Sequence, residues 1–358
     1  MSKIRKKISI LMLLALVLVF NFCSYAIGVK KIDIINDSEG PSELVKSVIA
    51  KNKKVDELGE IPVMMYHAIK NRGKNDKVYI GGNVDEEGYN RTIDAFKQDL
   101  EMYYVNGYRM IRLIDYINGV IDVPYGKSPI VLTFDDANIT DIHVLGKDTN
   151  GELILDKDCT VAILEEFKKK YPDFNVTATF FIINNNFLQT QYIDDILKYL
   201  ISHGYDIGNH TLDHGNLEKL SEFQVMYEVG GMYRYLKEKV GDSYVKVVAL
   251  PKGNPVNDKH PNYKFIINGV VDDFTYKTDG ILKVGWKPNE SPFSKNFNPY
   301  TIKRCRAYDN NGKVYDIEMV FRLLNKSRYV SDGDKNTITI PKNRESELKN
   351  TKLKVIKY

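Results

Sequence analysis

The sequence predicts an α/β fold in which parallel strands, each followed by a helix, close into a barrel. Short apolar runs recur along the chain from residue 61 onward, and helical patterns fall between several of them. No repeat or low-complexity tract interrupts this alternation. Strands that alternate with helices are typical of parallel βαβ units, and about seven such strands indicate a barrel.

The expected elements follow one another in chain order. The apolar runs that predict strands are Ile61–Met65, Tyr108–Leu113, Ile130–Phe134, Val176–Ile183, Tyr205–Gly208, Lys246–Leu250 and Phe265–Val271. The helical patterns are Thr92–Asn106, Thr160–Lys170, Asp194–His203 and Ser221–Val240. An alternating strand within Arg328–Pro341 is expected to close the edge of the barrel.

Composition narrows the function classes. The chain has 358 residues, of which 43% are hydrophobic and 27% charged, so it can bury a large core and is neither disordered nor a multi-span membrane protein. Its formal charge of +4 is carried by Lys3, Arg5, Lys6 and Lys7, and the rest of the chain is balanced. A balanced chain lacks the electrostatic footprint of a nucleic-acid binder, so we expect no nucleic-acid partner.

The first 26 residues are typical of an export signal. The four cations precede the apolar run Ile8–Phe20, and Ser24-Tyr25-Ala26 is small at both positions that signal peptidase reads. Residues 1–26 are therefore either a signal peptide cleaved after Ala26 or an uncleaved anchor, because the apolar stretch reaches about 20 residues if its polar members are tolerated. We expect a secreted or cell-surface protein whose only membrane contact is this segment.

The remaining chain divides into a linker and a folded domain. Residues 27–60 are charge-rich and are expected to form a stalk. Residues 61–358 are expected to form the domain, with a C-terminal closing segment from about residue 307. Cys159 and Cys305 could form one disulfide or remain two buried thiols, and two cysteines do not make a disulfide framework.

Chemistry-bearing residues follow the expected strands at one end. His67 follows the first run, the pair Asp135-Asp136 ends the run that begins at Ile130, and His210 and His214 follow the run that ends at Gly208. The carboxyl ends of the strands form the active-site face of a parallel barrel. We therefore expect these side chains to converge.

The convergence predicts an open metal site. Two adjacent carboxylates at the end of a buried strand are costly without a compensating cation, although one could instead cap a helix. A four-residue spacing would place His210 and His214 on one helical face as metal ligands, or as two ordinary surface histidines. Together with Asp136 they supply one oxygen and two nitrogens, the three-ligand pattern of catalytic zinc. Thr211 stands where a zincin helix has Glu, so this is not a metalloprotease pattern.

These residues carry a family resemblance. Thr133-Phe134-Asp135-Asp136, followed by His210-Thr211-Leu212-Asp213-His214, resembles the polysaccharide deacetylase family, also called the NodB-homology or carbohydrate esterase family 4 enzymes. The resemblance runs from about Ile61 to Arg306. It implies a distorted (β/α)7 barrel of the NodB-homology type, a divalent metal, with zinc expected, held by Asp136, His210 and His214, and Asp135 as general base. It also implies an acetylated polysaccharide as substrate.

The chain departs from the family pattern at several positions. Ala137 replaces a usual Gly, and Ala249 stands where the family has an Arg that steadies the base. Lys252 could substitute for that Arg or be merely solvated. The family's late Leu-x-His, its usual proton donor, has no match, because the segment Ile302–Arg306 offers cations and no imidazole.

An early histidine could replace the missing late one. Met65-Tyr66-His67 resembles the start of circularly permuted family members, the poly-N-acetylglucosamine deacetylases, in which an early His donates the proton. His67 is therefore the expected acid, its pKa held high by a nearby carboxylate. A structural role for His67, as a hydrogen-bond partner of a neighbouring loop, stays open.

The resulting hypothesis is metal-dependent removal of N-acetyl groups from an extracellular glycan, peptidoglycan or another N-acetylglucosamine polymer. Two alternatives stay open. An esterase that removes O-acetyl groups from a polysaccharide would have the same metal site but no amine to protonate, so the missing late histidine would matter less. A catalytically impaired glycan-binding protein would retain the barrel without turnover.

Overall fold

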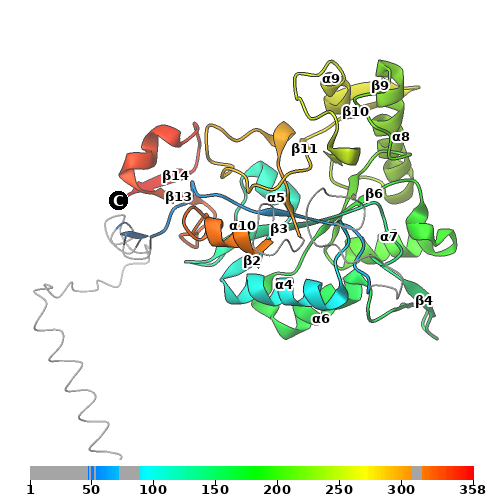
Figure 1. Ribbon diagram of the computed structural model, residues 1–358, viewed down its shortest axis with the longest axis horizontal. Coiled ribbons are helices and arrows are strands. Elements are labelled where there is room, and N and C mark those ends of the chain that lie inside the picture. Colours follow the sequence, from blue (N-terminus) through cyan, green and yellow to red (C-terminus); the bar gives the residue numbers. More distant parts are fainter. Residues whose placement is uncertain (1–46, 48–49, 52–53, 72–88, 308–316) are drawn as a thin grey trace, which may run out of the picture. The chain divides into compact units, whose positions relative to one another are not determined.

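The computed structural model describes residues 47, 50–51, 54–71, 89–307 and 317–358 (Figure 1). The expected export signal at residues 1–26 and most of the expected stalk lie outside this part of the chain. Among the residues that the structure describes, no helix is both long and apolar enough to cross a bilayer. Both Cys159 and Cys305 are buried free thiols.

The predicted parallel barrel is confirmed. Neighbouring strands of the main sheet pair in parallel, in the order β11-β8-β7-β6-β3-β1-β12, with β2 paired to β3 beside this path. Their bounds are β1 (Val63–Tyr66), β2 (Tyr108–Met110), β3 (Ser128–Asp135), β6 (Thr179–Ile182), β7 (Asp206–Asn209), β8 (Val247–Ala249), β11 (Gly280–Leu282) and β12 (Cys305–Arg306).

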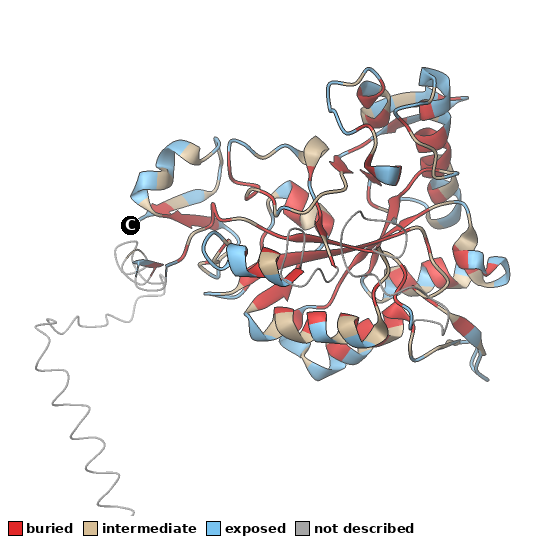
Figure 2. Ribbon diagram, viewed as in Figure 1, coloured by how far each residue is buried: buried red, intermediate tan, exposed pale blue. Residues whose placement is uncertain are grey.

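The helices surround these strands. They are α4 (Ile93–Val105), α5 (Leu113–Asn118), α6 (Thr160–Lys170), α7 (Ile193–Ser202), α8 (Glu222–Val240), α9 (Tyr263–Ile267) and α10 (Ile317–Leu324). Figure 2 shows burial concentrated on the strands and on the inner faces of the helices. All eight residues of β3 are buried, as expected of a central strand of a parallel sheet covered on both faces.

Local sequence sets the start of the long helices. Ser221 and Gln224 form a reciprocal capping box at the N-terminus of α8, and the Thr92 side chain accepts a hydrogen bond from the backbone at the start of α4. Helices α4 and α6 lie side by side (Figure 1), and Lys170 Nζ of α6 lies 3.0 Å from a Glu101 carboxylate oxygen of α4.

The strand that closes the barrel differs from the one expected. Backbone bonds join Ile302 to β11, and three residues later Cys305 pairs with Met64 of β1, so the segment Ile302–Arg306 connects the two edges of the sheet. The Arg328–Pro341 segment, to which this closing role was assigned, contains β13 (Thr337–Ile340). Within the described part of the chain, that strand pairs with β14 (Lys354–Lys357), in a two-stranded sheet separate from the barrel strands.

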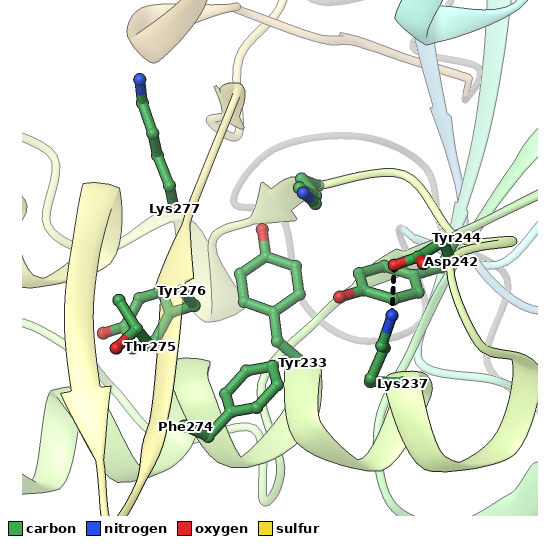
Figure 3. Close-up of a pocket in the computed structure, with 9 residues that line it drawn as sticks. Tyr233, Lys237, Asp242, Tyr244, Phe274, Thr275, Tyr276 and Lys277 are labelled. Atoms are coloured by element: carbon green, nitrogen blue, oxygen red, sulfur yellow. Dashed lines mark hydrogen bonds and ion pairs between the residues drawn. The ribbon is translucent and has the colours of Figure 1, made fainter.

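The last predicted strand also lies elsewhere. Phe265–Val271 contains the end of α9 and then β9 (Asn268–Val271), which forms an antiparallel hairpin with β10 (Phe274–Lys277) against α8. Tyr233 of α8 lies between Tyr276 of β10 and Tyr244, with ring centroids 5.8 and 5.9 Å away (Figure 3). Another short hairpin, β4 (Val144–Lys147) with β5 (Leu153–Leu155), follows the strand β3.

Part of the expected stalk belongs to the folded domain. Val55 and Leu58 are buried, and the buried Glu57 carboxylate accepts hydrogen bonds from the Tyr329 hydroxyl and the Thr339 backbone. Burial, reinforced by the charge of Asp332, raises the pKa of Glu57 to about 8. A stalk assignment based on charge density was wrong here, because a few buried residues are enough to dock a short segment.

Candidate metal centre

The carboxyl ends of three barrel strands meet at the candidate site. His67 directly follows β1, Asp135 is the last residue of β3, and His210 directly follows β7. Asp136 and His214 lie in the loops after β3 and β7. All five residues that the sequence analysis selected are therefore brought to one end of the barrel, where parallel strands present their functional groups.

Asp136, His210 and His214 form a compact set of possible metal ligands. One ligand atom from each residue lies within 4.8 Å of the other two. The Oδ1 atom of Asp136 is 3.2 Å from Nε2 of His210 and 3.5 Å from Nε2 of His214. His210 Nδ1 donates to the Ala249 carbonyl at 2.8 Å, which orients its Nε2 atom toward Asp136.

The two histidines meet through a loop rather than along a helix. Residues 210–216 have no helical structure, and Thr211 and His214 have left-handed backbones, with φ of 68° and 55°. The Thr211 amide donates to the Asn209 side chain at 2.8 Å, and the loop brings the two imidazole centroids to 4.9 Å. The expected helical face was wrong, although the expected proximity of the rings was correct.

A buried ion pair holds the second carboxylate. Arg304 Nη1 and Nη2 donate to the two oxygens of Asp135 at 2.7 and 2.6 Å, and both residues are buried. Arg304 also donates from Nη1 to Thr133 Oγ1 and from Nε to the Lys283 carbonyl, each at 3.3 Å. Burial alone would raise the pKa of Asp135, but Arg304, together with His210 and His67, outweighs that effect and lowers it.

Arg304 is the site residue that the sequence analysis missed. It occupies the closing segment that joins β11 to β1, and it supplies the guanidinium that Ala249 cannot provide. Lys252 is exposed and has a left-handed backbone, with φ of 58°, so the solvated alternative describes it. The cation-rich run around residue 304 was the available signal, but it did not indicate which side chain would point inward.

His67 lies beside both carboxylates. Its Nε2 atom is 3.9 Å from Asp135 Oδ2 and 4.0 Å from Asp136 Oδ2, and its side chain is 15% exposed. Its ring packs on Tyr89, with centroids 4.6 Å apart. Burial, together with the charges of Arg304 and His210, lowers the pKa of His67 despite the opposing effect of the two carboxylates, so the expectation of a raised pKa was wrong.

The backbone around Asp136 has strained dihedral angles and is held by a hydrogen bond from another loop. Asp136 and Ala137 have φ of 79° and 50°, a region that favours glycine and that explains why the family usually has Gly at position 137. The Asn185 side chain donates to the Asp136 carbonyl at 2.9 Å. A loop after β6 therefore helps to fix the orientation of this carboxylate.

The side chains of Asp136, His210 and His214 shift one another's pKa values. Burial would raise the pKa of Asp136, but the hydrogen bond from His210 and the other nearby imidazoles lower it well below its usual range. Burial would lower the pKa of His210, and Asp135 and Asp136 reverse that effect and raise it. His214 has a lowered pKa, first because of burial and then because of His210. Asp136 is thus an ionised carboxylate at neutral pH, as a metal ligand requires.

The sequence of this region matches a known family. Residues 122–264, which include both aspartates and both loop histidines, match the polysaccharide deacetylase family. This segment of the chain belongs to the polysaccharide deacetylase family. The matched segment ends before Arg304 and begins after His67, so these two site residues lie outside it.

A deacetylase of known activity is similar to part of this chain. A peptidoglycan-N-acetylglucosamine deacetylase of Bacillus cereus is 33% identical over 99 residues, which is 28% of this chain and 27% of the relative. The match therefore spans about a quarter of the length of that relative.

Solved structures of deacetylases share the fold. A Streptococcus pyogenes deacetylase, solved in complex with acetate, superposes with a TM-score of 0.52 at 17% identity, covering 73% of this chain and 97% of that one. A polysaccharide deacetylase from Bacillus cereus gives a TM-score of 0.51 at 17% identity, covering 74% of this chain and 69% of the other. At these identities the likeness establishes the NodB-type (β/α)7 barrel.

Proposed function

We propose that this chain is a metal-dependent hydrolase that removes N-acetyl groups from an extracellular glycan, leaving a free amine and acetate. The observation that carries the proposal is the division of labour between adjacent aspartates. Asp136 faces two imidazoles, whereas Asp135 is held by Arg304 and remains outside the ligand set. Hydrolysis of an unactivated amide needs both an electrophile and a separate base.

The residues present fit a divalent ion, with zinc expected. Asp136, His210 and His214 offer one oxygen and two nitrogens, and the hydrogen bond from His210 Nδ1 to Ala249 leaves Nε2 free to coordinate. When bound, such an ion supplies Lewis-acid activation of water and of the acetyl carbonyl.

Asp135 is suited to accept a proton from the attacking water. Because Arg304 lowers its pKa, the carboxylate is ionised at neutral pH, and two parallel hydrogen bonds fix its plane. Arg304 does not reach the substrate in this role, so it is a positioning residue.

His67 is placed by its position to donate a proton to the departing nitrogen. Its Nε2 atom lies within 4.0 Å of both carboxylates, on the rim where the reaction would occur. The same histidine favours a second candidate, an O-acetyl polysaccharide esterase. Burial lowers the pKa of His67, and a neutral imidazole is adequate for an ester, whose leaving group requires less protonation than an amine.

Two further observations support the substrate class and the location. The curated relative is a peptidoglycan-N-acetylglucosamine deacetylase, which supports peptidoglycan or another N-acetylglucosamine polymer as the substrate class. The cations and apolar run of residues 1–26 support export, either as a secreted protein or anchored by that segment.

Acetate release tests the proposal. Purified protein with added zinc is incubated with N-acetylglucosamine oligomers and, separately, with acetylated xylan, with Asp135→Asn as the matched control. We expect acetate and new amines from the oligomers, and a loss of both in the control. Release from xylan alone would establish the esterase instead. Glycan binding without release from either would support the impaired binding protein.

A further inference from the structure

The loop that carries Asp136 contains a further aspartate, which is fully buried. Asp141 has no exposed surface, and its Oδ2 atom accepts a hydrogen bond from the Asn138 amide at 2.9 Å. Its own amide donates to the Asn138 carbonyl, also at 2.9 Å. The Asn138 side chain in turn donates to the carbonyl of Asp135, the last residue of β3, at 3.0 Å. These bonds fold the loop back onto the end of β3, with Asp136 and Ala137 held between.

The backbone of Asp141 is also attached to helix α6. The Val161 amide donates to the Asp141 carbonyl at 2.9 Å. The preceding amide, that of Thr160, donates to the Thr140 carbonyl at the same distance of 2.9 Å. Thr160 and Val161 begin α6, and the first amides of a helix need partners from outside it. Because α6 carries none of the candidate site residues, it is an independent support for the loop, and the Asp141 side chain passes this fixed position on to the Asn138 amide.

Asp136 needs support because its backbone is strained. It and Ala137 are left-handed, and such residues persist only where the surrounding structure fixes them. On one side, the Asn185 side chain holds the Asp136 carbonyl. On the other side, the first amide after the strained pair is that of Asn138, whose acceptor is the Asp141 carboxyl. Without that acceptor the loop should relax, and the Asp136 carboxylate would move relative to the two imidazoles that it faces.

Stability alone does not explain a carboxyl at position 141. Its other oxygen, Oδ1, is buried and has no hydrogen-bond partner among the residues that the structure describes. A buried polar atom without a partner costs stability, which an apolar side chain of similar size would avoid. Burial raises the pKa of Asp141, and the charges of Asp136 and Asp135 add to that effect. The uncharged acid still offers Oδ2 as an acceptor, so the contact with Asn138 does not need a negative charge.

We propose that Asp141 is a positioning residue for the candidate metal centre. Its carboxyl holds the loop in the conformation that aims the Asp136 carboxylate at His210 and His214, although it is not one of the ligands. The inference rests on the proposed function and deepens it, because it names a residue outside the ligand set that controls metal affinity. The alternative is a residue that only stabilises the fold, and its loss would leave the metal affinity unchanged.

Two substitutions at position 141 separate these roles. Asp141→Ala removes the acceptor, whereas Asp141→Asn retains an acceptor oxygen in a side chain of nearly the same size. Glu57→Ala is the matched control, because Glu57 is another buried acid that accepts a backbone amide, that of Thr339 in β13. No candidate site residue lies in β13. If Asp141→Ala does not fold, Asn138→Ala replaces it, because that half-buried side chain holds the Asp135 carbonyl in the same loop.

The decisive measurement is the zinc affinity of full-length protein, by competition with a chromophoric chelator well below the unfolding temperature of each variant. Asp141→Ala should weaken zinc binding by about tenfold to 100-fold, the usual effect of losing a group that orients a metal ligand. Asp141→Asn should remain close to wild type, and Glu57→Ala should lose stability but keep wild-type affinity.

Three results would overturn the proposal. The first is unchanged affinity in Asp141→Ala, or in Asn138→Ala where that variant takes its place. The second is an Asp141→Asn variant that binds zinc as weakly as Asp141→Ala, because the acceptor oxygen would then not be what matters. The third is an equal loss of affinity in Glu57→Ala, because affinity would then follow stability alone.

Acetate release distinguishes a failure of this proposal from a failure of the proposed function. If wild-type protein binds zinc but releases no acetate from any glycan, the proposed function fails, and the zinc affinities of the Asp141 variants still decide the positioning role. If wild-type protein releases acetate and Asp141→Ala binds zinc as tightly as wild type, the positioning role fails alone. A wild-type protein that takes up no zinc would overturn both.

Discussion

Removal of the Arg304 guanidinium should destabilise the protein more than loss of any surface ion pair. The side chain is fully buried, and it donates to both oxygens of Asp135. Two unit charges roughly 4 Å apart interact by about 4 kcal/mol at an effective dielectric constant near 20. Breaking a buried pair by removing one partner costs about 3–5 kcal/mol, because the other charge stays buried. We therefore expect Arg304→Met to lower the free energy of unfolding by about 4 kcal/mol at pH 7.

The pH dependence has a defined sign. Asp135 has a lowered pKa in the folded protein, so the pair stabilises the fold above the ordinary carboxyl pKa of 3.8 and loses this contribution as the pH falls through the folded value. In Arg304→Met, Asp135 stays buried but loses the neighbouring positive charge, so its pKa should rise above the value in the unfolded chain. The deficit of the variant should thus be largest at neutral pH and shrink as the pH falls toward about 4.

Urea unfolding of full-length protein, followed by circular dichroism between pH 4 and 8, measures both effects. Arg304→Lys retains a charge but loses the bidentate geometry, and should fall between wild type and Arg304→Met. The double variant Arg304→Met/Asp135→Asn removes both charges and should recover most of the loss, which also covers the case in which the single variant does not fold. A cost below about 1 kcal/mol for Arg304→Met, the value of an exposed pair, would refute this reasoning.

Four further outcomes are expected. His210→Ala should abolish zinc binding measured by elemental analysis after zinc loading, and a wild-type protein that takes up no metal would contradict the whole site. Asp135→Asn should retain metal while acetate release falls by about 10² or more, whereas loss of metal would reverse the roles of the two aspartates. His67→Ala should retain metal and lose amide hydrolysis more than hydrolysis of an activated ester, and equal losses would exclude His67 as the acid. Folding raises the pKa of Glu57 to about 8, so the free energy of unfolding of the wild-type protein should fall as the pH rises from about 5 to 8. Glu57→Gln should remove this pH dependence, and unfolding experiments that find the same slope in the variant would contradict the role of Glu57.

The sequence predicted correctly the placement of site residues that directly end or follow a buried apolar strand. Asp135 ends the eight-residue buried strand β3, Asp136 follows it, and His210 follows the four-residue buried strand β7, so parallel-barrel geometry was enough to place them together. The helical spacing of His210 and His214 was misleading, because left-handed backbones at Thr211 and His214 produce the same proximity in a loop.

Short strands were the principal failure of sequence reasoning. β11 has three residues and β12 has two, which is too short for any periodic pattern, so the closing segment was not recognised. Phe265–Val271 is apolar because it ends a helix and enters a hairpin, not because it lies in the barrel. Arg304 could not be assigned to Asp135 without this topology, since 169 positions separate them.

The closing segment also has a consequence for biosynthesis. During translation Asp135 is made long before Arg304, so a nascent barrel that ends short of residue 306 has neither its final edge pairing with β1 nor the counter-charge of Asp135. Both deficits disappear together when Ile302–Arg306 docks between β11 and β1. Completion of the barrel and neutralisation of its buried charge are thus one event, and truncated chains that stop before this segment should be targets for proteolysis rather than partially active enzymes.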